Sequence, residues 1–341
     1  MNPNMAYYAL ATKIATKKGR ILSEDLWNKL IDCSTVEELT HLLKNNIEFG
    51  KAFNDITNAN LNRDDLETVL LRFKTLEIEN LLHYFSGPYK EFIKIVLTEA
   101  EIQDLSLILR KITKGESLEG IEERFVHSKI YSNLPFDDLL ASNSIEKVTQ
   151  KLKGTPYYNG LSNLTKEDAM TREFHIEMKL YVALYRTLFE KAEKLEKADQ
   201  KAVKEVLGFK IDLLNMQWIY RAKKYYNISP EEIFIYSLEG GTILGYSRLK
   251  KLCYATVEEF RQLLKEFLRN DLFKDTNADI NVVIDTYMLD YINKKSFNNI
   301  GTVLSFIYLL GIIINDLTSI TEGIQYNVPK NKLKDYLAYK I

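Results

Sequence analysis

Apolar residues recur at three- and four-residue spacing along most of this chain, which is the period of one face of an α-helix. From 166 to 207 the apolar positions keep this spacing, and charged pairs four residues apart fill the other face. Gly208 is expected to end this stretch before a further helix begins at about residue 211. The stretches 61–112 and 279–326 predict equivalent helical hairpins. Because only 14 Gly and 6 Pro are available for the turns of a β fold, the sequence predicts an all-α protein.

Two of these helical segments, 101–110 and 212–221, align with one another without a gap. Each begins with an acidic residue, continues with aliphatic residues at matching positions and ends with an arginine, Arg110 or Arg221. The two segments are 111 residues apart. A fixed period of this size indicates an internal repeat, which has to be recognised before the fold can be assigned.

A second landmark with the same period is a helix start, in which a Ser or Thr caps the first exposed backbone amides. It recurs at Thr35, Ser144 and Thr256, with offsets of 109 and 112 residues. A Glu three residues later, the spacing of a capping box, is present in the first and third copies, whereas Lys147 replaces it in the second. The two landmarks together predict three related helical units of about 110 residues.

The third copy of the acidic helix is expected near residue 320, where Asp316 corresponds to Asp104 and Glu322 replaces the arginine. In that case the C-terminal helix completes the first unit, the chain ends meet, and the three units close around a pseudo-threefold axis. The predicted units are 1–115 (completed by about 300–341), 116–227 and 228–341, the last of which carries the closing helix.

Composition excludes several classes of function. The 341 residues carry 46 basic and 47 acidic side chains, a formal net charge of −1, which gives no basic footprint for nucleic acid and no field to steer an acidic substrate. Cys33 and Cys253 do not make a disulfide framework, and both are expected to be buried thiols in a reducing cytoplasm.

The sequence also predicts no membrane-spanning segment. Residues 1–22 contain no apolar core of a signal peptide. The most apolar stretch, 300–314, is shorter than the roughly 20 residues that a bilayer span needs. We expect this stretch to be a buried core helix.

The motifs that resemble reactive sites fail on their chemistry. The glycine spacing of 240–245 is similar to a phosphate loop, but Tyr246 and Ser247 stand where Lys and Ser or Thr are required, so a turn before a helix is favoured. Asp137 and Asp138 lack the third acid of a metal-binding motif and suit a helix start. None of the four His residues has a partner at metal-ligand spacing. The sequence therefore predicts no catalytic, cofactor-binding or metal-binding residue.

Glu101 and Asp212 each lie at the border of an apolar helix stripe, where an acid requires a hydrogen-bonding partner. The alternatives are an internal tie between helices, which we favour, and a charge that faces a partner protein. Tyrosine is abundant, with 21 residues that include Tyr225 and Tyr226. Its wet hydroxyl and apolar ring suit protein interfaces and the seams between helices equally.

The repeats resemble a known family. The run 212–223, followed by Glu239-Gly240-Gly241, is similar to the C subunit of the V-type (archaeal and bacterial A-type) ATPases and ATP synthases, the homologue of the eukaryotic d subunit. The segments 18–22 and 101–115 fit the same family, and the resemblance covers essentially the whole chain. The chain departs from the pattern at Lys147 and Glu322.

The resemblance implies a funnel of three similar helical domains in the central stalk of a rotary ATPase. Such a subunit sits on the cytoplasmic face of the membrane, on the proteolipid ring of the rotor, and receives the rotating shaft subunits. It transmits torque for ion transport but is not itself an enzyme, and it binds no cofactor, nucleic acid or small-molecule substrate. The alternatives are a helical-repeat adaptor with an unrelated partner and a helical enzyme, and the latter would need a carboxylate or metal cluster.

Five basic residues are candidates for contacts with partners, because acidic loops and helix ends are the natural partners of exposed cations. They are Lys17, Lys18, Arg20, Arg110 and Arg221. The alternative for each of them is a solvated side chain that contacts no partner.

Overall fold

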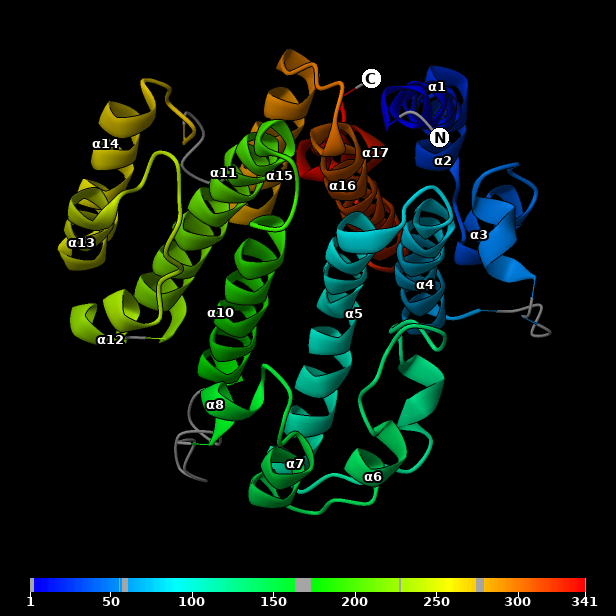
Figure 1. Ribbon diagram of the computed structural model, residues 1–341. Coiled ribbons are helices and arrows are strands. Elements are labelled where there is room, and N and C mark those ends of the chain that lie inside the picture. Colours follow the sequence, from blue (N-terminus) through cyan, green and yellow to red (C-terminus); the bar gives the residue numbers. More distant parts are fainter. Residues whose placement is uncertain are drawn as a thin grey trace. The chain divides into compact units, whose positions relative to one another are not determined.

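The computed structural model is helical throughout the part of the chain that it describes, with no β-strand there (Figure 1). The described residues are 3–54, 56, 61–162, 173–226, 228–273 and 279–340. The all-α prediction is confirmed. Two of the predicted hairpins are present as α4 (Arg63–Leu82) with α5 (Gly87–Lys114) and α15 (Ile280–Lys294) with α16 (Ile300–Gln325).

The helices group into two compact units, one formed by 1–74 with 197–341 and the other by 75–196. Besides α15, α16 and the first half of α4, the first unit contains α1 (Pro3–Ile21), α2 (Glu24–Asp32), α3 (Val36–Lys44), η1 (Phe49–Phe53), α11 (Lys197–Arg221), η3 (Ala222–Tyr226), α12 (Pro230–Ile235), α13 (Tyr246–Tyr254), α14 (Val257–Leu268), α17 (Lys330–Leu333) and η4 (Lys334–Tyr336). The second contains the end of α4, α5, η2 (Ile121–Arg124), α6 (Phe136–Leu140), α7 (Ile145–Lys151), α8 (Tyr158–Leu161) and α10 (Glu173–Ala192). The boundaries of the three repeat units stay a prediction.

Helix α16 is the centre of the first unit. It packs against α1, α3, α11, α15 and α17, and most of its side chains between Ile300 and Thr321 are buried. Among the described residues α16 alone is long and apolar enough to cross a membrane, but 72% of its most apolar window is buried inside the protein. The prediction of a buried core helix for 300–314 is confirmed.

The C-terminal residues lie against the N-terminal helices of the same unit. The Tyr339 hydroxyl donates to the Leu22 carbonyl at 2.8 Å, and its ring lies 5.1 Å from that of Trp27. Glu322 forms an ion pair with Arg63 at the start of α4. Closure of three units around one axis stays a prediction.

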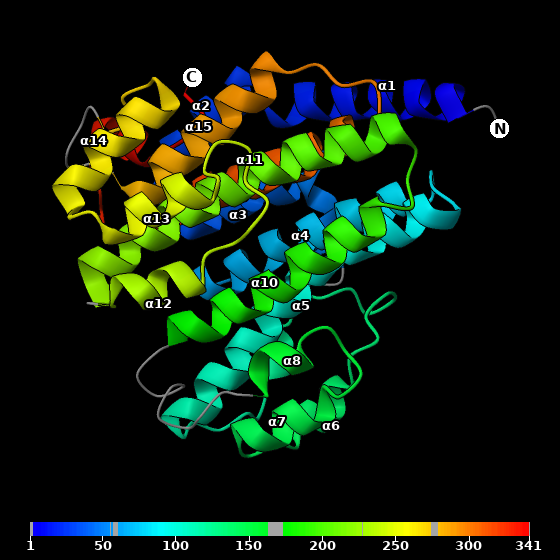
Figure 2. The same ribbon diagram turned by 60° about the vertical axis from the view of Figure 1, so that its left-hand side comes forward.

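In the second unit, α5 and α10 pack along one another, while α7 contacts α5, α6 and α8 (Figures 1 and 2). The break expected at Gly208 is wrong, because α11 continues from Lys197 to Arg221. The chain interrupts the helical run earlier, between Ala192 and Lys197. Residues 166–172, with which the predicted helical stretch begins, lie outside the described residues.

The predicted helix starts are confirmed. Thr35, Ser144 and Thr256 each accept a hydrogen bond from the backbone amide three residues later, at 3.1, 3.3 and 3.2 Å. The complete capping box forms only at Thr256. In the first copy the Glu38 carboxylate accepts from the Ser34 amide instead, one residue before the cap.

The two cysteines differ in their surroundings. Cys253 is fully buried at the end of α13, as predicted. The expectation for Cys33 is wrong, because this thiol is half-buried at the end of α2. Its Sγ lies 3.3 Å from the Lys29 carbonyl one turn earlier in the helix.

Candidate functional site

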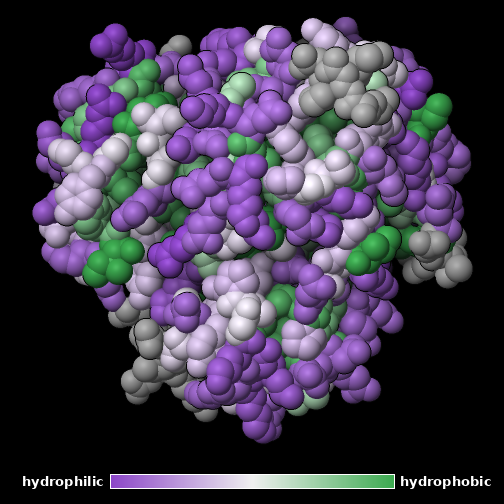
Figure 3. All heavy atoms as spheres, in the orientation of Figure 1, coloured by the Kyte–Doolittle hydropathy of each residue, from purple (hydrophilic) through white to green (hydrophobic). Residues whose placement is uncertain are grey.

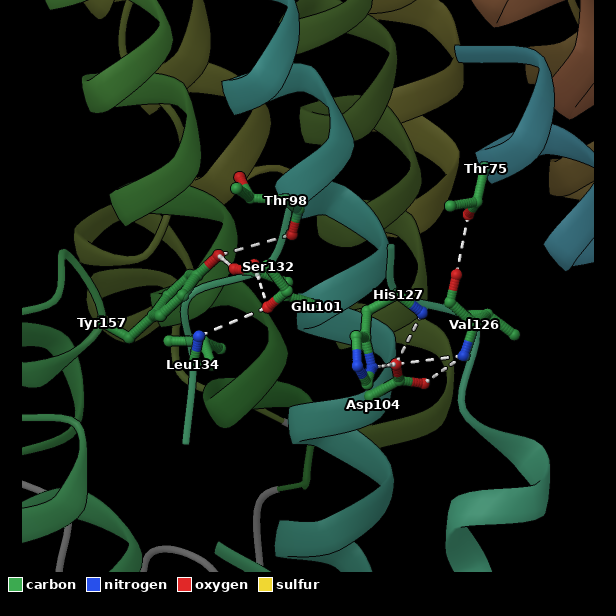
Figure 4. Close-up of polar contacts among 9 residues, drawn as sticks. All are labelled: Thr75, Thr98, Glu101, Asp104, Val126, His127, Ser132, Leu134 and Tyr157. Carbon is green, nitrogen blue, oxygen red and sulfur yellow. Dashed lines mark hydrogen bonds and ion pairs between the residues drawn. The ribbon is translucent and has the colours of Figure 1, made fainter. Parts of the chain in front are cut away.

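Helix α5 carries two buried carboxylates one turn apart, Glu101 and Asp104, which are 5% and 1% exposed. Residues three apart share one face of a helix, so both carboxylates face the segment that follows α5 in the chain (Figure 4). A buried carboxylate is costly unless hydrogen bonds satisfy it. The partners of these two residues therefore determine what they do.

Asp104 holds the chain that follows η2. Its carboxylate accepts from the backbone amides of Val126 at 3.0 Å and His127 at 2.9 Å, and the His127 Nδ1 lies 2.7 Å away (Figure 4). The His127 ring stacks on Phe136 with the ring centroids 3.8 Å apart. From the other side, the Thr75 hydroxyl donates to the Val126 carbonyl at 2.7 Å. The segment is thus fixed between α4 and α5 by both of its backbone polar groups.

Glu101 is bound by two hydroxyl groups from different loops. The Ser132 hydroxyl donates to one carboxylate oxygen at 2.7 Å, and the Tyr157 hydroxyl donates to the other at 3.1 Å (Figure 4). Burial raises the pKa of Glu101, although both hydroxyl donors act to lower it. Burial also raises the pKa of Tyr157 well above its usual value, with a further contribution from the charge of Glu101. Glu101 also lines a pocket of about 380 Å³.

Asp212, the aligned residue in α11, makes the more extensive tie. Its fully buried carboxylate accepts from the amides of Thr242, Ile243 and Leu244 at 2.9, 2.7 and 2.9 Å, and from the Thr242 hydroxyl at 2.9 Å. Burial raises the pKa of Asp212, and the hydrogen bonds from Leu244, Ile243 and Thr242 oppose this increase.

Two glycines permit this approach of the loop to α11. A Cβ at Gly241 would lie 2.1 Å from the Asp212 carboxylate, and a Cβ at Gly208 would lie 2.9 Å from the Gly240 carbonyl. Both distances are too short for carbon, so larger side chains would displace the loop. Gly208 therefore serves close packing between α11 and the loop and does not end a helix.

A second set of ties recurs at Asp104, Asn215 and Asp316, the positions that the sequence repeat aligns. Asn215 exchanges two hydrogen bonds with the Leu238 backbone, at 2.9 and 2.8 Å. Asp316 accepts from the amides of Ala338 at 2.8 Å and Tyr339 at 2.9 Å. In all three places a buried, short polar side chain holds the backbone 22 or 23 residues later.

These contacts decide whether Glu101 and Asp212 form internal ties or present a charge to a partner protein. Both Glu101 and Asp212 are buried, and their carboxylates bind groups of their own unit. The prediction that both residues form internal ties is confirmed, but each tie joins a helix to loop residues and not to another helix. The partner of each tie was not predicted.

Comparison with known proteins identifies the family. A family model described as "ATP synthase (C/AC39) subunit" matches residues 10–336. The chain belongs to this family. The A-type ATP synthase C subunit of Archaeoglobus fulgidus is 24% identical over 337 residues, which are 96% of this chain and 94% of the relative. Its counterpart in Methanosarcina acetivorans is 22% identical, with 97% and 92% covered, and that of Methanosarcina mazei is 26% identical, with 72% and 67% covered. The resemblance that the repeats indicated is confirmed.

The loop 240–245, whose glycine spacing is similar to that of a phosphate loop, has a structural role in this chain. Consecutive backbone amides that converge on one point form an anion site, as they do in phosphate-binding loops. Here the amides of 242–244 converge on Asp212, so the anion is a carboxylate of the protein itself. The loop is thereby bound to α11.

Two of the predicted contact residues of α1, Lys17 and Arg20, form a charged cluster with Glu48, whose side chain is 2% exposed. Lys17 Nζ lies 3.2 Å and Arg20 Nη1 lies 3.0 Å from the Glu48 carboxylate, and Lys51 lies at 3.4 Å. Burial alone would raise the pKa of Glu48, but the hydrogen bonds from Arg20 and Lys17 and the nearby charges bring it below the usual value. The expectation that Lys17 is exposed is wrong, because Lys17 is only 7% exposed and its ammonium group pairs with the buried Glu48 carboxylate.

The other candidates lie elsewhere. Lys18 is half-buried, and burial lowers its pKa. Arg110 is exposed near the end of α5 in the second unit, whereas Arg221 is half-buried at the end of α11 in the first. Of the five candidates, the structure brings only Lys17 and Arg20 together, through Glu48, and a role in partner contacts stays a prediction for all five.

Proposed function

We propose that this chain is a non-catalytic central-stalk subunit of a V-type rotary ATPase, which links the rotating shaft subunits to the proteolipid ring. The observation that carries the proposal is the family match over 10–336, with relatives named as A-type ATP synthase C subunits that align over nearly their full length. In this role the subunit lies peripherally on the cytoplasmic face of the membrane and transmits torque for ion transport. Its three repeat units form the predicted funnel.

The buried ties support this role. A subunit that transmits torque has to resist deformation, and loops held only by surface contacts would yield under load. Here the segments after α5, α11 and α16 are each bound to a buried side chain of the preceding helix. Satisfied hydrogen bonds in a buried environment make such connections stiff and specific.

Two further observations favour a peripheral, protein-mediated position. The apolar residues of α16 are already covered by other helices of its unit. On the face shown in Figure 3, hydrophilic residues cover most of the surface and hydrophobic residues lie in small, separate groups. Such a surface suits docking to other proteins through polar contacts and does not suit insertion into lipid.

Reconstitution tests the proposal. Vesicles that carry the complex without this subunit are expected to hydrolyse ATP in the catalytic head but to lose ATP-driven ion transport, and addition of the purified chain is expected to restore transport. Normal ion transport per ATP in its absence would show that the subunit is not the link. Recovery of the chain in a stable complex outside the ATPase would favour the adaptor alternative.

A further inference from the structure

The end of α11 and the two short helices after it expose an unusual concentration of large hydrophobic side chains. Eleven such side chains are exposed among the described residues, and five of them lie between 225 and 254. These five are Tyr225 (62% exposed), Tyr226 (46%), Ile235 (72%), Tyr246 (71%) and Tyr254 (49%). We call the region that they occupy, formed by η3, α12 and α13, the α12–α13 surface.

The elements of this surface are joined to one another. Helices α12 and α13 pack together beside the end of α11 (Figures 1 and 2). The Phe234 ring of α12 meets the Tyr246 ring of α13 edge-on, with the centroids 5.1 Å apart. At the other end, Lys223 of η3 donates to the Cys253 carbonyl at 2.5 Å. The elements that carry the exposed side chains are therefore joined to one another within a single unit.

The part that η3 contributes is held in place by cation–aromatic contacts. The Tyr220 hydroxyl accepts from Lys224 and Arg261, both at 3.1 Å. The Lys224 ammonium also lies 5.2 Å from the ring centres of Tyr220 and Tyr225. Residues 222–226 form a single π-helical turn, a rare conformation that occurs frequently at functional sites. This second observation, independent of exposure, also points to a function of the region.

Helix α13 presents a stripe that matches another helix in length. Tyr246, Lys250 and Tyr254 follow one another at intervals of four residues and are all exposed, whereas Leu249 and Leu252 on the other side are buried. Eight residues of helix span about 12 Å, which is a little over two turns. An apolar stripe of this length with a central cation fits the apolar face of an amphipathic helix with carboxylates at its edge.

The charge of the region specifies the kind of partner. Residues 221–254 contain six basic and three acidic side chains, a net charge of +3 in a chain whose formal net charge is −1. We propose that the α12–α13 surface binds an acidic amphipathic helix of a neighbouring protein subunit, whose apolar face covers the tyrosines and Ile235 and whose carboxylates pair with Lys224 and Lys250. This inference rests on the proposed function, since it takes the partner from the same complex. A second copy of this surface would be repelled by its like charge.

Photocrosslinking in the assembled complex tests the identity of the partner. Tyr246 is replaced by benzoylphenylalanine, and the matched control carries the same replacement at Tyr326, which is 72% exposed at the end of α16. The expected product at Tyr246 contains an acidic helical segment of another subunit, and the control does not give that product. A product with lipid or with a second copy of this chain, or no product, would overturn the inference.

Binding measurements provide the second test. The double variant Tyr246→Ser/Tyr254→Ser and the variant Lys250→Glu are each expected to bind at least tenfold more weakly to complexes stripped of this subunit, while Tyr326→Ser binds like the wild type. Thermal melting should be unchanged in Lys250→Glu and Tyr326→Ser, because these side chains are exposed. The double variant loses the contact of the Tyr246 ring with Phe234, so circular dichroism has to show that it is folded at the temperature of the binding measurement. Equal binding of the variants refutes the α12–α13 surface alone. Failure of the wild-type chain to bind the stripped complex would instead refute the proposed function.

Discussion

Replacement of Asp212 tests whether the ties hold the loops in place. In Asp212→Ala the loop loses four hydrogen bonds to a buried carboxylate. A hydrogen bond to a charged acceptor contributes about 1.5–3 kcal/mol to stability. Because Thr242 is exposed, water can replace the two bonds that it makes, whereas the Leu244 side chain is only 2% exposed. The two hydrogen bonds from the amides of Ile243 and Leu244 alone therefore contribute about 3–6 kcal/mol to the free energy of unfolding.

The cost of keeping an ionised carboxylate in a buried position reduces this figure. Burial raises the pKa of Asp212 despite its four donors, so the tie does not recover the full desolvation penalty. We therefore expect the lower end, about 3 kcal/mol, for Asp212→Ala. Asp212→Asn is expected to lose less stability than Asp212→Ala, because the amide oxygen of asparagine can still accept hydrogen bonds from the loop. The asparagine NH2 group, however, would face only other donors.

Hydrogen exchange measures the effect where it occurs. The amides of 242–244 are expected to exchange at least tenfold faster in Asp212→Ala, and urea unfolding followed by circular dichroism should show the loss of stability. Asp290→Asn is the matched control, since this carboxylate is 54% exposed and its removal should change stability by less than about 0.5 kcal/mol. If Asp212→Ala behaves like Asp290→Asn in both measurements, the tie does not stabilise the loop and the reasoning is wrong.

Three further predictions concern other parts of the molecule. Burial raises the pKa of Asp316 from 3.8 to about 7, so the folded state takes up a proton at higher pH than the unfolded state. The free energy of unfolding therefore falls as pH rises from about 4 to about 7, by up to about 4 kcal/mol. Asp316→Asn should remove this dependence on pH in urea titrations, and an unchanged dependence would show that Asp316 is not its cause. Lys17→Met is expected to lower the free energy of unfolding by about 1–3 kcal/mol, because it removes a partner from the buried Glu48. Arg20→Met should lower it by less than about 1 kcal/mol, because the Arg20 side chain is 51% exposed. If urea unfolding gives the reverse order, Lys17 is not the main partner of Glu48. Calorimetry with MgATP should show no stoichiometric binding, because the glycine loop already binds a carboxylate of its own unit.

The features that the sequence predicted correctly depend on local patterns. Helices follow from apolar spacing, and the cap at Thr256 follows from residues three positions apart. The correspondence of Asp104 and Asp316 followed from spacing between repeats. The partners of the ties lie 22 or more residues away, and no local pattern encodes which backbone amide meets which side chain. The burial of Lys17 was not predicted for the same reason, since Glu48, the buried acid with which it pairs, lies 31 residues later in the chain.

The three aligned ties differ in chemistry, and the difference shows what the fold requires of them. Asn215 donates to a carbonyl as well as accepting from an amide, so its tie needs no ionised group and is independent of pH. Asp104 has a histidine beside it in addition to its backbone donors. Asp316 has two backbone amides, and the nearby charge of Asp285 opposes its ionisation while Lys340 favours it. The position of a short polar side chain, more than its charge, therefore defines the tie. At Asp316, whose pKa burial raises to about 7, the tie that holds the C-terminal segment depends on pH.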